Sequence, residues 1–513
     1  MSPSAFLRPG SSALEYKMHQ MVSSSGNPFQ IDAALLRGVS LRSTLRGLGW
    51  IWRLRPEGMT DRTWWRLWQT TRSVCAYDVF ISHTWKTSGT EKLLALLLST
   101  GWPFALCLWF LSVAAAVVIQ WSWLLPMPFS HEVHVMGFVA DCPLGPCAML
   151  AGMLALALAF IAVPYAPLPA RDDCFLDVAC IHQKDPGLKE RGIYSIGGFL
   201  KHAKELRVLW TPPYLSRLWC VFELAAYRVA NPTGKITLAP IFIEHSVLVC
   251  TAVLWCSAWC YFVAMAAGLP EDGVFRSEVI PLAISVLPLA GLVHRLRNLF
   301  SAKRQLFEEL RKFDLGSAQC TEVFDSLFVH SAIQSWYGSP EEFESFVKGP
   351  LLQEVSGHFS ATGNLPFAYC LLLATAPVTV TIDETISLWL GGAPGTAVLS
   401  SVIGHVYGTC FCWFLVSIKF LYYLCDRFAV ARGTGKRSYL QTMLIFLSFC
   451  ACYIGGSFVG GVAYRKSLEA ALAHAVGCSA AALACLGRPR LSKRLSRLCS
   501  CAQLSKEGST EEP

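Results

Sequence analysis

Eight long apolar stretches constrain this chain more than any other feature of its sequence. A helix needs about 20 mostly apolar residues to cross a bilayer. The stretches run approximately over 102–126, 147–166, 246–269, 279–296, 364–382, 397–424, 440–463 and 468–486, and the last is rich in alanine and only moderately apolar. One soluble core could not hold eight such helices. The sequence therefore predicts a multi-pass α-helical membrane protein with about eight spans and the lipid bilayer as a partner.

The composition supports this fold class. Hydrophobic residues make up 53% and charged residues 15% of the 513 residues, whereas a soluble globular chain carries about 25% charge. A disordered chain is excluded because it could not be this apolar. A large soluble enzyme is disfavoured because too few polar groups remain to cover its surface.

The placement of Lys and Arg predicts the orientation, because cytosolic loops carry an excess of both. With a cytosolic N-terminus, the non-cytosolic loops lie near 127–146, 270–278, 391–396 and 464–467. Those loops hold only 3 of the 43 Lys and Arg residues, and the basic tail 487–513 stays inside. We therefore expect both termini in the cytosol of a membrane whose kind the sequence does not specify. The net charge of +8 follows from this topology, so nucleic acid is not expected as a partner.

The N-terminal region, residues 1–76, is basic and rich in tryptophan. It carries ten Lys and Arg against four Asp and Glu, and five Trp residues lie among its arginines: Trp50, Trp52, Trp64, Trp65 and Trp68. Such a helix suits the membrane interface, where amphipathic rings and cations both find partners. A helix packed on a cytosolic domain is the equally weighted alternative.

Short apolar segments alternate with helical segments between the first spans. Strands are predicted over 77–83, 174–180, 206–210 and 236–243, with helices over 90–100, 193–204 and 215–230. This alternation predicts parallel βαβ units in a doubly wound sheet. The segments 77–82 and 174–180 should pair side by side, because each is apolar on both faces and too short to stand alone. Chemistry in such sheets collects at the carboxyl ends of the strands.

Three motifs in these segments resemble those of a known family. Tyr77–His83, YDVFISH, resembles the opening strand of TIR (Toll/interleukin-receptor) domains, and Ser216–Leu224, SRLWCVFEL, resembles the Trp-Cys-x-x-Glu-Leu helix start of plant-type TIR domains. Phe175–Gln183, FLDVACIHQ, resembles a strand of the related fungal heterokaryon-incompatibility domain. The resemblance covers 77–100 and 172–245. It implies a cytosolic α/β flavodoxin-like TIR-like domain in two pieces.

The resemblance also predicts how the chain is divided. A transmembrane hairpin, 102–166, separates the two pieces, and a second hairpin, 246–296, follows them. The polar helical region 297–360 would complete the domain, and 364–486 would form four further transmembrane helices. A hairpin enters and leaves at one membrane face, so the sheet can still close.

The resemblance implies a site and a reaction. Many TIR domains cleave the glycosidic bond of NAD through an oxocarbenium-like state that a carboxylate stabilises. The motif places that carboxylate at Glu223. In the loop after the first strand, His83, Trp85 and Lys86 stand where NAD-cleaving relatives carry an aromatic residue and basic residues, usually Tyr-Arg. Asp177 and Trp219 also match motif positions. The resemblance therefore implies Glu223 as the catalytic residue and His83, Trp85, Lys86, Asp177 and Trp219 as nucleotide-binding residues. NAD would be a substrate, and no cofactor or metal is expected.

Several other residues carry weaker signals. Cys180 and Cys220 are expected to be core thiols, because an apolar setting raises thiol pKa. Cys142 and Cys147 share a non-cytosolic loop, where a disulfide is an open alternative. Asp383, Glu384, His405 and Lys419 lie within or at the edge of spans, where charges are functional candidates by default. The paired broken helices that mark transporters are not evident.

Three functions therefore compete. The first is a membrane signalling protein whose TIR-like domain hydrolyses NAD when it clusters as a homo-oligomer. The second has the same architecture with an inactive domain that serves for self-association. The third is a channel or transporter regulated by that domain. Glu223 favours the first, and the absence of Arg from the first loop favours the second. The third would need a polar stripe on several spans.

Overall fold

The computed structural model describes residues 29–54, 58–122, 127–166, 172–212, 214–267, 280–320, 323–354, 356–357, 365–429 and 435–486. The first 28 residues and the basic tail 487–513, on both of which the sequence makes predictions, lie outside these ranges. The chain divides into two compact units. The first, here called the sheet unit, holds the chain up to Leu97, Val163–Phe242 and Ala302–Val355. The second, here called the membrane unit, holds Leu98–Ala162, Ile243–Ser301 and the chain from Ser356.

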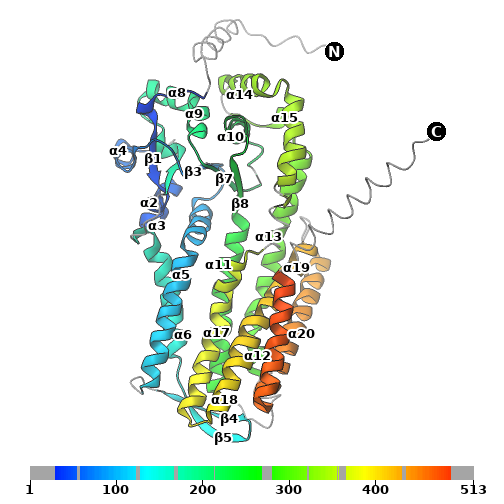
Figure 1. Ribbon diagram of the computed structural model, residues 1–513. Helices are drawn as coiled ribbons and strands as arrows, with labels where there is room; N and C mark the ends of the chain where they lie inside the picture. Colours follow the sequence, from blue (N-terminus) through cyan, green and yellow to red (C-terminus); the bar gives the residue numbers. More distant parts are fainter. Residues whose placement is uncertain are drawn as a thin grey trace, which may run out of the picture. The chain divides into compact units, whose positions relative to one another are not determined.

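A six-stranded sheet organises the sheet unit, in the order β2-β1-β6-β3-β7-β8 (Figure 1). The strands are β1 (Arg37–Ser40), β2 (Arg72–Ser73), β3 (Val79–His83), β6 (Asp173–Phe175), β7 (Glu205–Trp210) and β8 (Lys235–Pro240). Strands β6, β3, β7 and β8 are parallel, whereas β1 is antiparallel to both of its neighbours. The predicted parallel sheet is therefore present, extended at one edge by antiparallel strands that the sequence did not reveal.

Strands β3 and β6 lie side by side, as predicted from their apolar character. Val79 pairs with Cys174 and Phe80 with Phe175. The second half of the predicted strand 174–180 is wrong, because Asp177–Cys180 forms a helical turn, α7. The Asp177 carboxylate accepts the Val178 N–H at 2.7 Å, and an acidic side chain at a helix start favours the turn over extended chain.

The described part of the sheet unit also contains five complete helices of six or more residues that follow β6 in the chain. They are α8 (Pro186–Tyr194), α9 (Ile196–Lys201), α10 (Leu218–Ala230), α14 (Val323–Tyr337) and α15 (Pro340–Phe346). The described residues of region 297–360 are mainly helical, as expected. Helix α14 of this region contacts α10, because the Tyr337 hydroxyl donates to the Ala225 carbonyl at 3.2 Å. Of the described residues of this region, only Gln319 makes a β-bridge, a single one to Arg217.

The N-terminal region packs mainly on the sheet unit. It forms α2 (Leu41–Thr44), α3 (Arg46–Arg53) and α4 (Asp61–Gln69) around β1 and β2. Trp52 and Trp64 are each only 4% exposed, which supports the packed-helix alternative for these two rings. Trp65 is exposed, and Leu48 is 75% exposed in a left-handed backbone conformation, φ 55°.

Seven helices of the described residues are long and apolar enough to cross a membrane. They are α5 (Gly89–Trp121), α6 with its 3₁₀ extension (Cys147–Tyr165), α11 (Ile241–Ala266), α17 (Phe367–Leu390), a continuous run of α18, η7 and α19 (Gly395–Arg427), α20 (Lys436–Lys466), and Leu468–Leu486. These helices fit a multi-pass membrane protein, and they include the alanine-rich last span.

The predicted span 279–296 is not among these seven helices. Its described part is divided between α12 (Ile280–Ser285) and α13 (Leu287–Arg311). Pro288 lies at the start of α13 and has no N–H with which to continue the hydrogen bonding from α12. The second half of α13 carries Lys, Arg and Glu residues, so α13 does not have the composition of a span.

The loop predicted over 127–146 contains a β-hairpin, β4 (Phe129–Val135) and β5 (Phe138–Leu144). Met136 and Gly137 both have positive φ, 52° and 83°, as a tight two-residue hairpin turn requires. Cys142 and Cys147 are separate thiols rather than a disulfide. The Cys142 sulfur packs so closely against Gly391 that a Cβ added there would lie 2.3 Å from it.

Polar residues inside the spans pair with one another or with backbone groups. The buried Asp383 carboxylate accepts the N–H groups of Ala148 and Met149, each at 2.9 Å, at the start of α6. Glu384 lies 3.5 Å from His405. The two N–H groups satisfy the Asp383 carboxylate, which would otherwise be costly to bury in an apolar environment.

Candidate functional site

The candidate site lies at the carboxyl end of β3, where Glu223 of α10 bonds the strand. Ser82, near the end of β3, donates its hydroxyl to the Glu223 carboxylate and also bonds the Tyr214 hydroxyl. The Tyr214 hydroxyl has one proton, which can be donated either to Ser82 or to the Cys220 carbonyl 3.3 Å away. These bonds hold the predicted catalytic residue against the first strand, in the part of a doubly wound sheet where ligands bind.

The Glu223 carboxyl group has an unusual affinity for protons. Burial, together with the nearby charge of Asp177, raises its pKa to about 8, although the Ser82 hydrogen bond acts in the opposite direction. At neutral pH most of this carboxyl is therefore protonated. A carboxyl with a strongly raised pKa is a candidate functional group, but it can stabilise a cation only after it loses its proton.

A second cluster surrounds the loop that follows β3. Trp85 donates its indole N–H to the Asp177 carboxylate at 3.0 Å, and the His83 ring lies between the rings of Trp52 and Trp85, with centroids 5.6 and 4.9 Å away. The structure therefore brings together three predicted site residues from β3, its following loop and α7.

Burial controls the charges of this cluster. His83 is 7% exposed, and burial lowers its pKa well below the usual value, so its ring is neutral. Its Nε2 atom has no hydrogen-bond partner among the described residues. Burial also raises the pKa of Asp177. An imidazole nitrogen without a partner in a buried site is available to a ligand.

The other two predicted site residues make contacts with the segment before α14 and with α14 itself. Lys86 is exposed, and its ammonium group donates to the Gln319 side chain at 3.3 Å. Trp219 donates its indole N–H to Asp325 at 3.1 Å, and its ring meets the edge of Phe222. Trp219 therefore has a structural role on α10, one helical turn before Glu223.

The thiols near the site are buried and inert, as the sequence predicts. Burial raises the pKa of Cys180 to about 12 and that of Cys220 well above its usual value. Cys220 donates its S–H to the His83 carbonyl at 3.6 Å. A nucleophilic thiolate needs a lowered pKa, so neither cysteine is suited to covalent catalysis.

Sequence reasoning missed three site residues: Ser82, Tyr214 and Lys92. Ser82 lies inside the strand motif, and Tyr214 precedes the helix motif, so their proximity to these motifs was the available signal. Lys92 directly precedes the apolar run Leu93–Leu98 and is only 1% exposed. Its ammonium lies over the Trp85 ring, 5.4 Å from the centroid.

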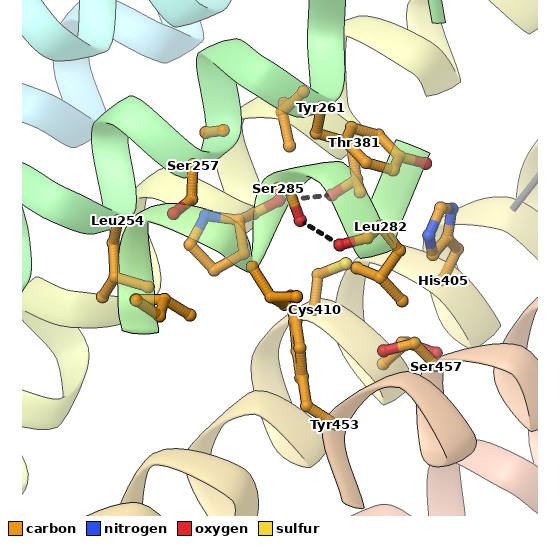
Figure 2. A pocket seen from close by; sticks show the side chains of 16 residues that line it. Leu254, Ser257, Tyr261, Leu282, Ser285, Thr381, His405, Cys410, Tyr453 and Ser457 are labelled. Atoms are coloured by element: carbon orange, nitrogen blue, oxygen red, sulfur yellow. Dashed lines mark hydrogen bonds between the residues drawn. The ribbon is translucent and has the colours of Figure 1, made fainter. Parts of the chain in front are cut away.

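A separate small pocket lies in the membrane unit, where α11, α12, α17, η7 (Ser401–Trp413) and α20 meet (Figure 2). Its volume is about 50 Å³, which is room for a few water molecules. The hydroxyls of Ser257, Ser285 and Thr381 each donate to a carbonyl of their own helix, at 2.7–3.1 Å. These three hydroxyl protons are therefore already engaged within the helices that carry them.

Comparisons with protein-family models, curated proteins and solved structures find no match to this chain. Among the described residues, no group of three or more His, Cys, Asp and Glu side chains could hold a metal ion.

Proposed function

We propose that this chain is a membrane-embedded signalling protein whose sheet unit is a cytosolic TIR-like domain that hydrolyses NAD on clustering. The observation that carries the proposal is Glu223 on α10, bonded to Ser82 at the carboxyl end of β3. Glu223 was the candidate carboxylate from the motif alone. Its contact with the first strand puts it at the edge where doubly wound sheets bind ligands.

The strand order supports a flavodoxin-like interpretation of the sheet. Numbered along the chain, the four parallel strands β3, β6, β7 and β8 lie in the order 2-1-3-4. Flavodoxin-like sheets have the order 2-1-3-4-5 and bind their ligand at the switch point between the first and third strands. Here that switch point lies between β3 and β7, beside Ser82 and Trp210.

In the proposed reaction, the Glu223 carboxylate stabilises the positive charge that develops on the ribose as the bond to nicotinamide breaks. Water then takes the place of nicotinamide, so the products are nicotinamide and ADP-ribose. The rings of His83 and Trp85 offer an aromatic face to the nucleotide. Deprotonated Glu223 is required at the moment of reaction.

The direct test is NAD consumption by the purified full-length protein in crowded membranes, beside Glu223→Ala. We expect stoichiometric release of nicotinamide by the wild type and none by the variant. Equal NAD loss in both preparations would assign the activity to a contaminant. If no NAD is lost even at high protein density, the hydrolase proposal is wrong, and the catalytically inactive self-association domain becomes the favoured function.

The raised pKa of Glu223 predicts the pH dependence of this activity. Because burial raises the pKa to about 8, about a tenth of the carboxyl is ionised at pH 7 and about nine-tenths at pH 9. We therefore expect kcat/KM, which reports the free enzyme, to rise roughly tenfold over this interval. Initial rates of nicotinamide release, corrected with Glu223→Ala, will measure it, and a flat profile would contradict this role for Glu223.

A catalytically inactive self-association domain is the second candidate. The observation in its favour is the same carboxyl group, which is mostly protonated at neutral pH, together with the Trp85-Lys86 pair that stands in place of Tyr-Arg. The protein would then form homo-oligomers through its TIR-like domain without consuming NAD. Regulation of a channel or transporter has weaker support, since the membrane pocket is small and mostly apolar.

A further inference from the structure

A second pocket lies beside the loop after β3, and three basic side chains line it. Its volume is about 400 Å³, and its described lining comes from the end of α3, the loop 85–88 and the first residues of α5: Trp52, Arg53, Leu54, Trp85, Lys86, Thr87, Ser88, Gly89, Thr90 and Lys92. No Asp or Glu is among these residues. A pocket of this size accommodates a small molecule, and its charge favours an anion.

Lys92 is the residue that points to a ligand. It lines the pocket and yet is only 1% exposed. Its ammonium group has no hydrogen-bond or ion-pair partner among the described residues, and it lies over the face of the Trp85 ring. The negative charge of Asp177 acts on Lys92 without a direct bond, and the same carboxylate accepts from Trp85. A buried cation without a direct partner is costly, and a bound anion would supply that partner.

The two cations nearer the surface are also not neutralised. Arg53 donates to the Leu48 carbonyl at 3.0 Å, and Lys86 donates to the Gln319 side chain at 3.3 Å. Both acceptors are uncharged. Three positive charges therefore border one pocket, and none has a carboxylate bonded to it among the described residues.

The start of α5 supplies backbone donors on the same side. The first N–H groups of a helix have no acceptor within the helix, and the helix dipole favours negative charge there. Gly89 opens α5, and a Cβ added at this position would lie 2.1 Å from the Trp52 carbonyl oxygen. The absence of a side chain lets the N-terminal region close against the helix start, so that Arg53 shares a pocket with Lys92.

We propose that this pocket binds a phosphate group, with Lys92 as its buried cation, Arg53 and Lys86 at its mouth, and the first N–H groups of α5 as further donors. Lys and helix N-termini are both common phosphate ligands. The phosphate can belong to a soluble molecule, such as inorganic pyrophosphate or a nucleotide, or to a lipid headgroup. The proposal does not require NAD hydrolysis and does not use Glu223.

The test uses the full-length, detergent-solubilised protein and its Lys92→Met variant, with inorganic pyrophosphate as probe. Methionine keeps the length of the side chain and removes the charge, so Lys92→Met should fold and gain thermal stability without ligand. We expect pyrophosphate to raise the melting temperature of the wild type. In Lys92→Met that shift should disappear, and the affinity measured by titration calorimetry should fall tenfold or more.

The controls separate this site from nonspecific binding and from the NAD reaction. Lys204→Met removes an exposed cation that is paired with Asp78, and it should bind pyrophosphate as the wild type does. Glu223→Gln should also bind it normally, whether or not the wild type consumes NAD. ADP-ribose and a short-chain phosphoinositide, titrated in parallel, will distinguish a nucleotide from a lipid source. Equal pyrophosphate binding by Lys92→Met and wild type, or no binding by the wild type, would overturn the proposal.

Discussion

Glu223→Gln should lower NAD turnover by a hundredfold or more while the protein still folds and inserts into membranes. The amide retains the shape of the carboxyl group and can still accept the Ser82 hydrogen bond, but it cannot carry the negative charge that meets the ribose cation. Removing one such electrostatic stabiliser costs roughly a hundredfold to a thousandfold in kcat. Nicotinamide release under saturating NAD, at pH 9 where the wild-type carboxyl is ionised, is the measurement.

The matched control for this experiment is Glu190→Gln. Glu190 is an exposed residue of α8 in the same unit, so this variant makes the same chemical change away from the site. It should retain wild-type turnover. Burial raises the pKa of Glu223 in the folded protein from 4.5 to about 8. The folded protein therefore loses stability as the pH rises from the pKa of the unfolded state toward that of the folded state. Glu223→Gln should therefore be at least as stable as the wild type at pH 9, and full activity in this variant would refute the proposed mechanism.

Asp383→Leu should cause the largest loss of stability in the membrane unit. The carboxylate accepts two backbone N–H groups at the start of α6 and the Gln120 amide at 3.3 Å. Leaving a buried donor without its acceptor costs roughly 1–3 kcal/mol, so the loss of both N–H partners should lower the free energy of unfolding by about 2–6 kcal/mol. Thermal unfolding in detergent, followed by the fraction of monodisperse protein, will measure the change.

Two further variants test whether the stability loss comes from the Asp383 hydrogen bonds. Asp383→Asn keeps a carbonyl oxygen that can accept from α6, so its loss should lie between those of the wild type and Asp383→Leu. Glu132→Leu changes an exposed acidic residue of the β4–β5 hairpin and should leave the melting temperature unchanged. If Asp383→Leu has the same melting temperature as the wild type, the two N–H groups have other acceptors and Asp383 does not stabilise the start of α6.

The periodicity and length of apolar segments were sufficient to predict the positions of those helices and strands that are long or strongly apolar. Seven spans, the strands β3, β7 and β8, and the helix α10 all lie close to their predicted positions. The pairing of β3 with β6 was also predictable, because two short strands that are apolar on both faces must be buried between neighbours. The helical turn at Asp177–Cys180 was not predictable, because its apolar residues fit a buried strand and a buried helical turn equally well.

The site was predictable only where a motif carried it. Glu223, His83, Trp85 and Asp177 came from family resemblance, and their mutual arrangement required the fold. Lys92 could not have been found by pattern, because a lysine near a helix start normally lies on the solvated face. The Lys92 ammonium group lies over the Trp85 ring, and Trp52, far away in the sequence, lines the same pocket; only the tertiary structure shows this arrangement. Strands β1 and β2 were missed because they have four and two residues.

The pairing of β3 with β6 also limits how many times the chain can cross a membrane. Adjacent strands lie on one side of a bilayer, so the crossings between them must be even in number, and the two span-length helices α5 and α6 fit this requirement. Helix α14 packs near α10, as the bond from Tyr337 to Ala225 records, so the chain must also return after α11. The described α-helices between α11 and α14 are α12 and α13, and neither alone is long and apolar enough to cross a membrane. The sheet thus imposes a parity rule on the membrane helices, and loss of one crossing would separate β3 from β6 by the thickness of the bilayer.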